Sequence, residues 1–280
     1  MPELPEIQAH AERLTERFRG RSLRGFRPIS FTVLKTATPS PDEAVGHPLV
    51  RVGRRGKYLL VEFEPAVFAV HLMQGGRLVV DSKQTAKPRG GQARFVFDEG
   101  PALLLTEQGS ERRAGVWCLP SHDVTTTLPL AGLGPEADHL APDDLLERFR
   151  RHPNQRIHGF LRDQRLVAGL GRRLANEVCH RARLSPFAMT HRLGPDEAAT
   201  VVEAIRACVA GGLEYERSQG DMGASKDRPS SVHGRTGQSC PVCGDPIGAV
   251  EYTGYTVHYC PTCQTGGKVL ADNTTSRFLK

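Results

Sequence analysis

Apolar residues near the N-terminus recur with the spacing of an α-helix. They stand at positions i, i+4, i+7 and i+11 and so form one stripe: Ile7, Ala11, Leu14 and Phe18. The pattern predicts one amphipathic helix that ends near Gly20.

Short apolar runs separated by Gly, Pro and Asp follow this helix. The gaps between them are too short for a helix that would connect parallel strands, so the pattern predicts an antiparallel β domain. The runs cover residues 58–63, 67–72, 77–80, 93–97 and 102–105.

The pattern changes to helical spacing from about Gly134 onward. Residues 142–147, 155–188 and 198–213 are expected to contain helices. Residues 218–226 are rich in Gly and Ser, which is typical of a loop that carries function. We therefore expect an α+β protein with an N-terminal domain over 1–132, a helical domain over 133–232 and a cysteine-bearing module over 233–280.

The charge of the chain limits the classes of partner. The 280 residues include 37 basic and 31 acidic side chains, a net charge of +6, which permits a polyanion such as nucleic acid. No apolar run approaches the roughly 18 residues of a membrane span. The N-terminus also lacks the basic and apolar regions of a secretory signal. We expect no membrane partner and a cytoplasmic protein.

Two Cys-x-x-Cys motifs lie near the C-terminus with sixteen residues between them. Four thiolates at this spacing suit one tetrahedral zinc ion, because each motif presents two sulfurs to the metal. The alternatives are a core of packed thiols and a redox pair, but a segment of this size buries too little surface to fold unaided. Four protein ligands leave no open coordination position, so we expect one structural zinc at Cys240, Cys243, Cys260 and Cys263. The other cysteines are expected to be buried thiols: Cys118, Cys179 and Cys208.

Pro2 becomes a secondary amine if Met1 is removed. An α-amine has a pKa near 8, so roughly a tenth is unprotonated at pH 7, more than a hundredfold the fraction for a lysine. Such an amine can attack an aldehydic carbon and form an iminium, with Glu3 and Glu6 as general acid–base candidates. Pro and acidic residues also favour helix N-termini, so the spacing alone leaves a purely structural role open.

Five motifs occur in one order along nearly the whole chain. Together they resemble the formamidopyrimidine-DNA glycosylase / endonuclease VIII family of base-excision repair enzymes. They are Met1–Glu6, Arg54–Leu60, His71–Leu72 with Gly75–Leu78, Asp163–Gly171 with Ala175–Glu177, and Val232–Gly237 ahead of the cysteines.

The resemblance implies a bilobal fold with DNA in the cleft between the lobes. An N-terminal β-sandwich would be followed by a helix-two-turn-helix domain and a zinc hairpin. The flipped-out nucleotide would be attacked at C1′ by Pro2, with Glu3 as acid–base residue at the sugar and Lys57 as proton donor. Loss of the damaged base and β-elimination would then cut the strand. The family further implies a nucleoid-associated monomer that binds damaged double-stranded DNA.

The residues that would hold DNA depart from the family pattern. Tyr255 replaces an arginine in the hairpin turn, Arg172 replaces an asparagine, and His158 replaces a lysine. Gln74 and Ala114 stand where the family has a Met and a Phe that fill the space left by the flipped base, and Arg112 and Arg113 remain beside them. The expected DNA-binding residues are His71, Gln74, Arg112, Arg113, His158, Arg172, Asn176 and Tyr255.

A bifunctional DNA glycosylase/AP lyase is the function that this set favours, because binding alone would not need Pro2, Glu3 and Lys57 together. A non-catalytic damage-binding paralogue is the alternative that the substitutions at Tyr255, Gln74 and Ala114 support. An unrelated zinc-ribbon adaptor would explain the cysteines and leave the N-terminal motif without a purpose. The excised base cannot be read from the sequence.

Overall fold

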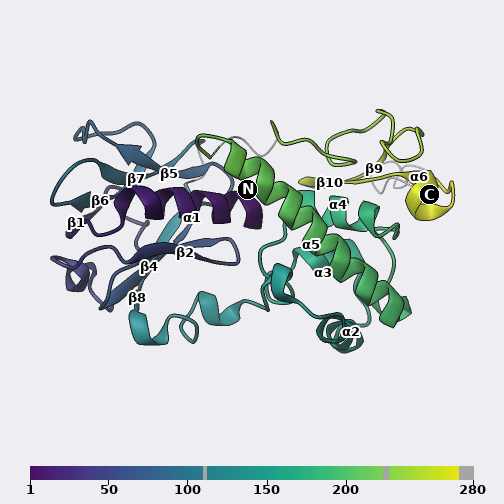
Figure 1. Ribbon diagram of the computed structural model, residues 1–280, viewed down its shortest axis with the longest axis horizontal. Coiled ribbons are helices and arrows are strands. Elements are labelled where there is room, and N and C mark those ends of the chain that lie inside the picture. Colours follow the sequence, from purple (N-terminus) through teal and green to yellow (C-terminus); the bar gives the residue numbers. More distant parts are fainter. Residues whose placement is uncertain (110–111, 223–226, 271–280) are drawn as a thin grey trace. The chain divides into compact units, whose positions relative to one another are not determined.

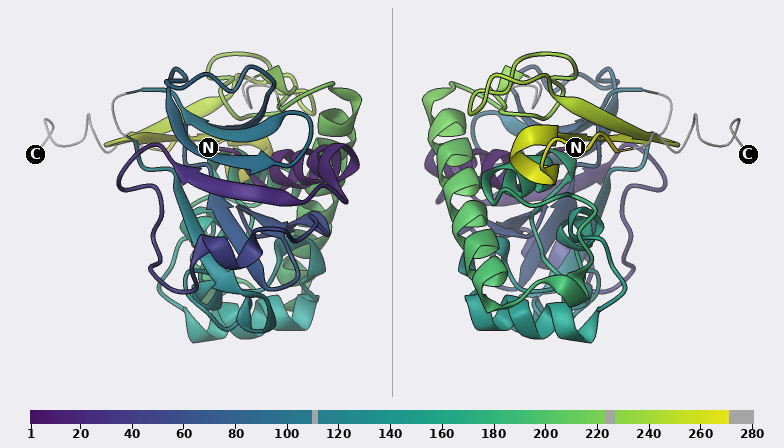
Figure 2. Two further views of the ribbon diagram at one scale, coloured as in Figure 1. Left: turned by 90° about the vertical axis from the view of Figure 1, so that its left-hand side faces the viewer. Right: turned by 90° about the vertical axis from the view of Figure 1, so that its right-hand side faces the viewer.

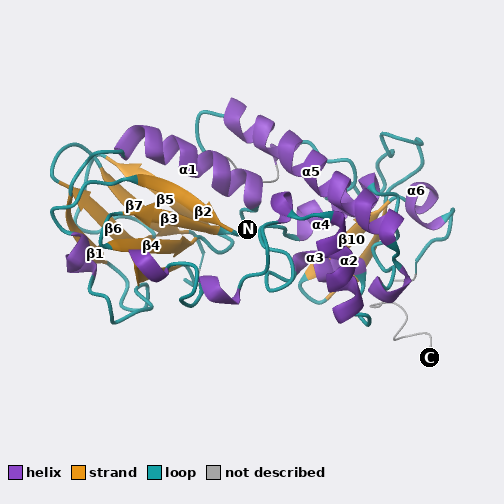
Figure 3. Cartoon of the chain, turned by 60° about the horizontal axis from the view of Figure 1, so that its bottom comes forward, coloured by secondary structure: helices purple, strands orange, loops and turns teal. Residues whose placement is uncertain are grey.

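The computed structural model describes residues 1–109, 112–222 and 227–270. By contacts the chain divides into two compact units, each made of two segments. The N-terminal unit comprises Met1–Leu133 and Leu213–Ser225, and the C-terminal unit comprises Gly134–Gly212 and Lys226–Lys280. Strands fill the first unit and helices dominate the second (Figure 3). Residues 223–226 of the expected loop lie outside the described part.

The N-terminal unit contains two antiparallel four-stranded sheets. One sheet has the strand order β1-β6-β7-β5 and the other β2-β3-β4-β8. The strands are β1 (Leu23–Pro28), β2 (Arg51–Arg55), β3 (Tyr58–Glu62), β4 (Ala66–His71), β5 (Gly76–Asp81), β6 (Gly91–Phe97), β7 (Ala102–Glu107) and β8 (Gly115–Pro120).

Phenylalanine side chains join the inner faces of the two sheets. Phe68 of β4 lies 5.4 Å from Phe26 of β1 and 5.1 Å from Phe95 of β6, measured between ring centroids. All three side chains belong to one buried apolar cluster. The predicted antiparallel β-sandwich is therefore confirmed.

Helix α1 (Leu4–Phe18) packs along β2 and β3 of this sandwich (Figure 1). Its apolar stripe is buried, as the spacing predicts, because Ile7 and Leu14 both join the core. The Thr15 hydroxyl and the main chain of Val52 exchange hydrogen bonds of 3.0 and 2.8 Å. This pairing fixes the helix against the edge strand of the sheet.

The C-terminal unit contains four helices and a cysteine hairpin, which we define as residues 239–265. The predicted helical stretch 155–188 is split by a turn, because the Gln164 side chain donates to the Leu170 carbonyl and accepts from the Gly169 amide. The helices are α2 (Pro142–Arg151), α3 (Ile157–Arg162), α4 (Arg172–Arg181) and α5 (Pro195–Ser218). The hairpin contains β9 (Gly248–Tyr252), β10 (Tyr255–Tyr259) and α6 (Pro261–Thr265), and it packs on α4.

Helix α5 is one continuous helix (Figure 2), and the division between the units falls within it, after Gly212. None of the described helices has the combination of length and hydropathy that a membrane span requires. Short 3-10 helices complete the secondary structure: η1 (Pro41–Ala44), η2 (Ser121–Asp123), η3 (Leu130–Gly132), η4 (Ala137–His139) and η5 (Thr190–Arg192).

Candidate functional site

The first turn of α1 holds two buried carboxyl groups. Glu3 is the N-cap residue: its side chain accepts from the Glu6 amide, and its own amide donates to Glu6 Oε2 over 3.2 Å. This reciprocal pairing satisfies two amides that a helix start leaves without partners. Glu3 is only 5% exposed and Glu6 1%, and Pro2 is buried beside them. The N-terminal motif is therefore fixed in place.

Lys57 lies in the turn between β2 and β3, and the turn points toward the start of α1. Val52 contacts Thr15, and two residues further on Arg54 Nε donates to Gln8 Oε1 over 3.1 Å. The strand and the helix thus run in opposite directions, so the turn beyond Arg54 approaches the residues ahead of Gln8. Lys57 is 7% exposed, which is rare for a lysine and places its ammonium within the protein.

His71 ends β4 opposite Tyr58, and their ring centroids are 4.7 Å apart. Burial, together with the positive charge of Lys57, lowers the pKa of His71 to about 4. The ring is therefore neutral at pH 7. Its Nδ1 accepts a 3.2 Å hydrogen bond from the Met73 amide, so the proton is on Nε2.

Gln74 is exposed at the tip of the loop between β4 and β5. The loop closes tightly, because a Cβ on Gly76 would lie 2.1 Å from the Leu72 carbonyl oxygen. The Gln108 amide donates to the Gly75 carbonyl over 3.3 Å, which joins this loop to the one after β7. That second loop carries Arg112 and Arg113, both exposed.

Ala114 does not lie at the surface. It is 2% exposed within the apolar cluster, and its amide donates to Glu107 Oε2 over 2.7 Å. A side chain at this position points into the core. Among the described residues of this loop, the exposed charged groups are Arg112 and Arg113, beside the exposed Gln108.

The other expected DNA-binding residues surround the turn of the cysteine hairpin. Arg172, the first residue of α4, donates from Nη1 to the Gly254 carbonyl over 3.0 Å. Asn176, one turn further along α4, is fully buried, and its amide donates to His233 Nδ1 over 2.8 Å. Its Oδ1 accepts from the His258 amide over 3.4 Å. Asn176 therefore fixes the hairpin to α4.

His158 lies in α3, 3% exposed, with its ring 6.4 Å from Tyr255 and nearly parallel to it. Burial, together with the charge of Arg162, lowers the pKa of His158 to about 3. Its imidazole is neutral at pH 7. The family pattern has a positively charged lysine at this position, whereas the His158 side chain carries no charge at pH 7.

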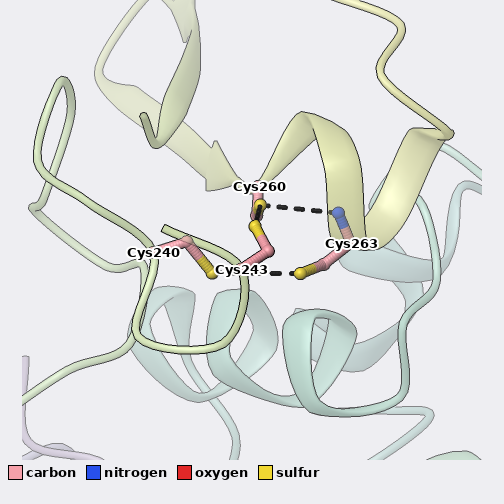
Figure 4. Close-up of side chains that lie close together, drawn as sticks. All are labelled: Cys240, Cys243, Cys260 and Cys263. Carbon is pink, nitrogen blue, oxygen red and sulfur yellow. Dashed lines mark hydrogen bonds between the residues drawn. The ribbon is translucent and has the colours of Figure 1, made fainter. Parts of the chain in front are cut away.

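Four cysteine sulfurs converge in the hairpin (Figure 4). Their Sγ atoms all lie within 4.8 Å of one another, with Cys240 and Cys263 3.9 Å apart and Cys243 and Cys260 3.4 Å apart. Four ligands at metal–sulfur distances of about 2.3 Å around a tetrahedral ion lie about 3.8 Å apart, so the cluster fits one ion. The His180 Nε2 atom lies 3.3 Å from Cys240 Sγ, which supports that sulfur from α4.

The remaining cysteines are not part of this cluster. Cys118 and Cys179 are buried and Cys208 is half-buried. Burial raises the pKa of each of these three thiols to about 12. They are unreactive thiols at pH 7.

Two groups at the hairpin were not anticipated. Arg162, at the end of α3, lies with its Cζ 4.2 Å from the centroid of the Tyr255 ring. Glu177 accepts hydrogen bonds from the amides of 231–233 and so fixes the segment that enters the hairpin. Both contacts join residues more than fifty positions apart, and neither leaves a periodic signal in the sequence.

Comparison with known protein families matches both units. The family described as formamidopyrimidine-DNA glycosylase N-terminal domain matches residues 1–117, and the family described as formamidopyrimidine-DNA glycosylase H2TH domain matches residues 131–222. Among relatives, the formamidopyrimidine-DNA glycosylase of Pelotomaculum thermopropionicum is 31% identical over 276 residues, covering 94% of this chain and 99% of that protein. The enzyme of the same name from Chloroflexus aurantiacus is 30% identical, covering 94% and 98%.

Solved structures show the same fold. MutM in complex with DNA containing carbocyclic 8-oxo-G matches with a TM-score of 0.84 at 22% identity, covering 94% of this chain and 100% of that one. Lactococcus lactis Fpg with DNA containing N7-benzyl-Fapy-dG gives the same TM-score and coverage. The family matches and the full-length relatives carry the assignment: this chain belongs to the formamidopyrimidine-DNA glycosylase / endonuclease VIII family.

Proposed function

We propose that the protein is a bifunctional DNA glycosylase/AP lyase that removes damaged bases from double-stranded DNA through its N-terminal proline. One observation carries the proposal: the first turn of α1 buries Pro2, Glu3 and Glu6, and the Lys57 turn is directed toward that end of the helix. The two carboxyl groups also cap the helix, but a helix start alone would not need a lysine that is 7% exposed in the turn directed toward it.

Base removal begins when the Pro2 nitrogen attacks C1′ of the flipped-out nucleotide. Removal of Met1 provides the lone pair for this bond. The bond between C1′ and the base breaks, and the base leaves with the bonding electrons and a proton. Lys57 is the proposed donor of that proton, because a compact ammonium carries three donors.

The bonded Pro2 nitrogen gives up its amine proton to water, and an iminium that leads to strand cleavage then forms as the sugar ring opens. Glu3 protonates O4′ as the C1′–O4′ bond breaks, and its carboxylate then removes a proton from C2′. The electrons of that C–H bond form a double bond to C3′, and the 3′ phosphate leaves. Water hydrolyses the iminium and restores the amine. Glu6, hydrogen-bonded to the Glu3 amide, keeps this end of the helix in position.

DNA contacts are proposed for two groups of residues. His71, Gln74, Arg112 and Arg113 occupy the strand ends and loops of the N-terminal unit, where the exposed side chains can meet the duplex. In the second group Arg172 is proposed to meet DNA from beside the hairpin turn, while Tyr255 and the buried side chains of His158 and Asn176 support that turn from within the protein. We propose that the hairpin metal is zinc, since four thiolates suit it and its role there is structural.

Borohydride trapping on duplex DNA with a single abasic site tests the lyase step directly, because reduction converts an iminium into a stable adduct. The protein with Met1 removed, verified by intact mass, is expected to form a covalent adduct and to cut the strand. Pro2→Gly is expected to lose most of the adduct, and Glu3→Gln about 10²- to 10⁴-fold in rate.

Pro5→Ala is the matched control, because Pro5 is buried in the same turn of α1 and offers no amine. It is expected to trap like the unmodified protein. Full trapping by Pro2→Gly would refute the proline mechanism. Tight binding of abasic-site DNA without an adduct would instead identify a non-catalytic damage-binding protein.

A panel of duplexes tests the glycosylase step and the choice of substrate. Each duplex carries one oxidised purine or one oxidised pyrimidine, and base release is measured separately from strand scission. We expect the protein to release the damaged base from at least one duplex and to cut that strand to the same extent. Strand cutting at abasic sites with no base release would reduce the function to a lyase.

A further inference from the structure

Three arginines and two tyrosines gather at the turn of the cysteine hairpin. We call Arg156, Arg162, Arg172, Tyr252 and Tyr255 the arginine–tyrosine cluster. The tyrosines come from the ends of β9 and β10, and the arginines come from α3, α4 and the residue before α3. All five belong to the C-terminal unit.

The two tyrosine rings form a platform for one guanidinium group. Their centroids are 4.8 Å apart and their planes differ by 7°. The Cζ atom of Arg162 lies 4.2 Å from the centroid of Tyr255, well within the range of a cation–π contact. Tyr255 thus holds the charge of Arg162 in place without pairing any of its N–H donors.

The other two arginines are also held by neutral partners. Arg172 donates from Nη1 to the Gly254 carbonyl over 3.0 Å. Arg156 donates from Nη1 to the Tyr252 hydroxyl over 3.0 Å, and its Cζ lies 5.3 Å from the ring of Phe187. Since each guanidinium has five donors, both retain donors for a ligand.

No carboxylate balances this charge in the described part of the chain. None lies within 4.0 Å of a nitrogen of the three arginines. Arg165, which is close in sequence, differs, because it forms a 2.7 Å ion pair with Asp163. Three guanidinium groups fixed by neutral groups present a concentrated positive charge, which suits a polyanion.

We propose that Arg162, seated on Tyr255, binds a backbone phosphate of the DNA, with Arg172 beside it. Tyr255 is then a positioning residue, and the charge that the family pattern places on the hairpin turn comes from α3 instead. This inference rests on the proposed function, because it supposes that DNA is the ligand. A direct contact between the Tyr255 hydroxyl and DNA is the alternative.

Binding to a duplex that contains a tetrahydrofuran abasic analogue tests the proposal without any cleavage. Fluorescence anisotropy over a series of salt concentrations gives the affinity and its salt dependence. Arg162→Gln is expected to weaken binding about tenfold. It should also reduce the slope of log K against log salt by about 0.9, the value for one phosphate contact.

Arg165→Gln is the matched control and is expected to leave the slope unchanged, because Asp163 already neutralises that arginine. Tyr255→Phe keeps the platform and should bind like the unmodified protein. Tyr255→Leu removes the platform and should reproduce most of the Arg162→Gln loss, with little further loss in the double variant. Metal content and thermal melting verify that each variant is folded.

Two results would overturn the proposal: an unchanged slope for Arg162→Gln, or equal losses for Tyr255→Phe and Tyr255→Leu, which would indicate a hydroxyl contact. The readout is independent of Pro2. If the unmodified protein forms the borohydride adduct but Arg162→Gln leaves the salt slope unchanged, only the phosphate site at Arg162 is refuted. If Arg162→Gln reduces the salt slope but the unmodified protein forms no adduct, the phosphate site is supported and the proposed lyase activity is refuted.

Discussion

The two ends of the chain differ in what holds them together. In the N-terminal unit, one buried cluster extends from α1 through both sheets and includes Phe68 at its centre. In the cysteine hairpin and the segment that enters it, the buried cluster comprises Val232, Cys240, Ile247 and Cys260, with Cys263 packed against it. The first region gains its stability from apolar burial, whereas three of the five residues in the second are metal-ligand candidates.

Removal of one thiolate should have the largest effect. Bound zinc contributes on the order of 10 kcal/mol in small metal-binding peptides. Cys260→Ser is therefore expected to abolish stoichiometric metal binding and to unfold the hairpin, while the N-terminal unit stays folded. Metal content and hydrogen exchange of the β9–β10 amides measure this. Cys208→Ser, which lies outside the cluster, is the control and should keep its metal. If the hairpin amides of metal-free Cys260→Ser were still protected from exchange, metal would not be what stabilises the hairpin.

Removal of a central aromatic ring should have the next largest effect. Phe68 is fully buried between the sheets, so Phe68→Ala is expected to lower the free energy of unfolding by about 3–5 kcal/mol. Phe31 is 100% exposed, and Phe31→Ala should change it by less than about 0.5 kcal/mol. Urea unfolding gives both values. Loss of metal from Phe68→Ala would show that the two regions are not independent.

Acid should weaken the N-terminal unit through His10, which is 3% exposed and contacts the Leu78 carbonyl with Nε2 at 2.7 Å. Burial lowers the pKa of His10 to about 4, whereas the unfolded value is 6.5. The unfolded chain thus binds more protons between these values, so stability falls as the pH drops from 6.5 to 4, by up to about 3 kcal/mol.

His10→Gln should make the stability profile less steep over this window, because the amide can still donate to Leu78. Part of the slope should remain, since the pKa of His71 is also lowered to about 4. His122→Gln changes an exposed histidine and should leave the profile as it is. Unfolding free energies at pH 6.5, 5 and 4 provide the measurement. An equally steep loss in His10→Gln would assign the acid sensitivity to other groups.

The smallest effect is expected where the hairpin has support other than metal. The Glu177 carboxylate accepts from three amides, those of Ser231, Val232 and His233, over 2.8–3.0 Å. Glu177→Gln is expected to cost about 1–3 kcal/mol of local stability, seen as faster hydrogen exchange in these residues. Glu251→Gln, exposed on β9, should have no such effect. If hydrogen exchange of these three amides were unchanged in Glu177→Gln, the carboxylate would not contribute to the stability of the segment that enters the hairpin.

The sequence predicted all four strands that have two neighbours and one edge strand, β5, which matches the run 77–80, and it missed three edge strands. The runs at 58–63, 67–72, 93–97 and 102–105 correspond to β3, β4, β6 and β7, which are inner strands. The missed strands are β1, β2 and β8, and each ends the order of its sheet. β1 and β2 expose arginines and contain glycine, so their patterns do not alternate.

The candidate site shows the same limit. The four cysteines were found because candidate ligands for one ion follow a short fixed spacing. Arg162 and Tyr255 are 93 positions apart, and their contact depends on how the hairpin packs beside α3. A substitution of one charge by an aromatic ring can be seen in a sequence, but the residue that supplies the charge instead can be found only in three dimensions.

Each unit is built from two separate segments, which has a consequence for synthesis on the ribosome. Arg13 Nη1 donates to the carbonyls of Glu216 and Gln219, so α1, made first, receives part of its cover only after more than two hundred residues have been translated. The sandwich can assemble early, but its N-terminal helix stays partly uncovered on the nascent chain. Neither unit corresponds to one uninterrupted stretch of the sequence, so a single continuous gene segment does not encode either of them.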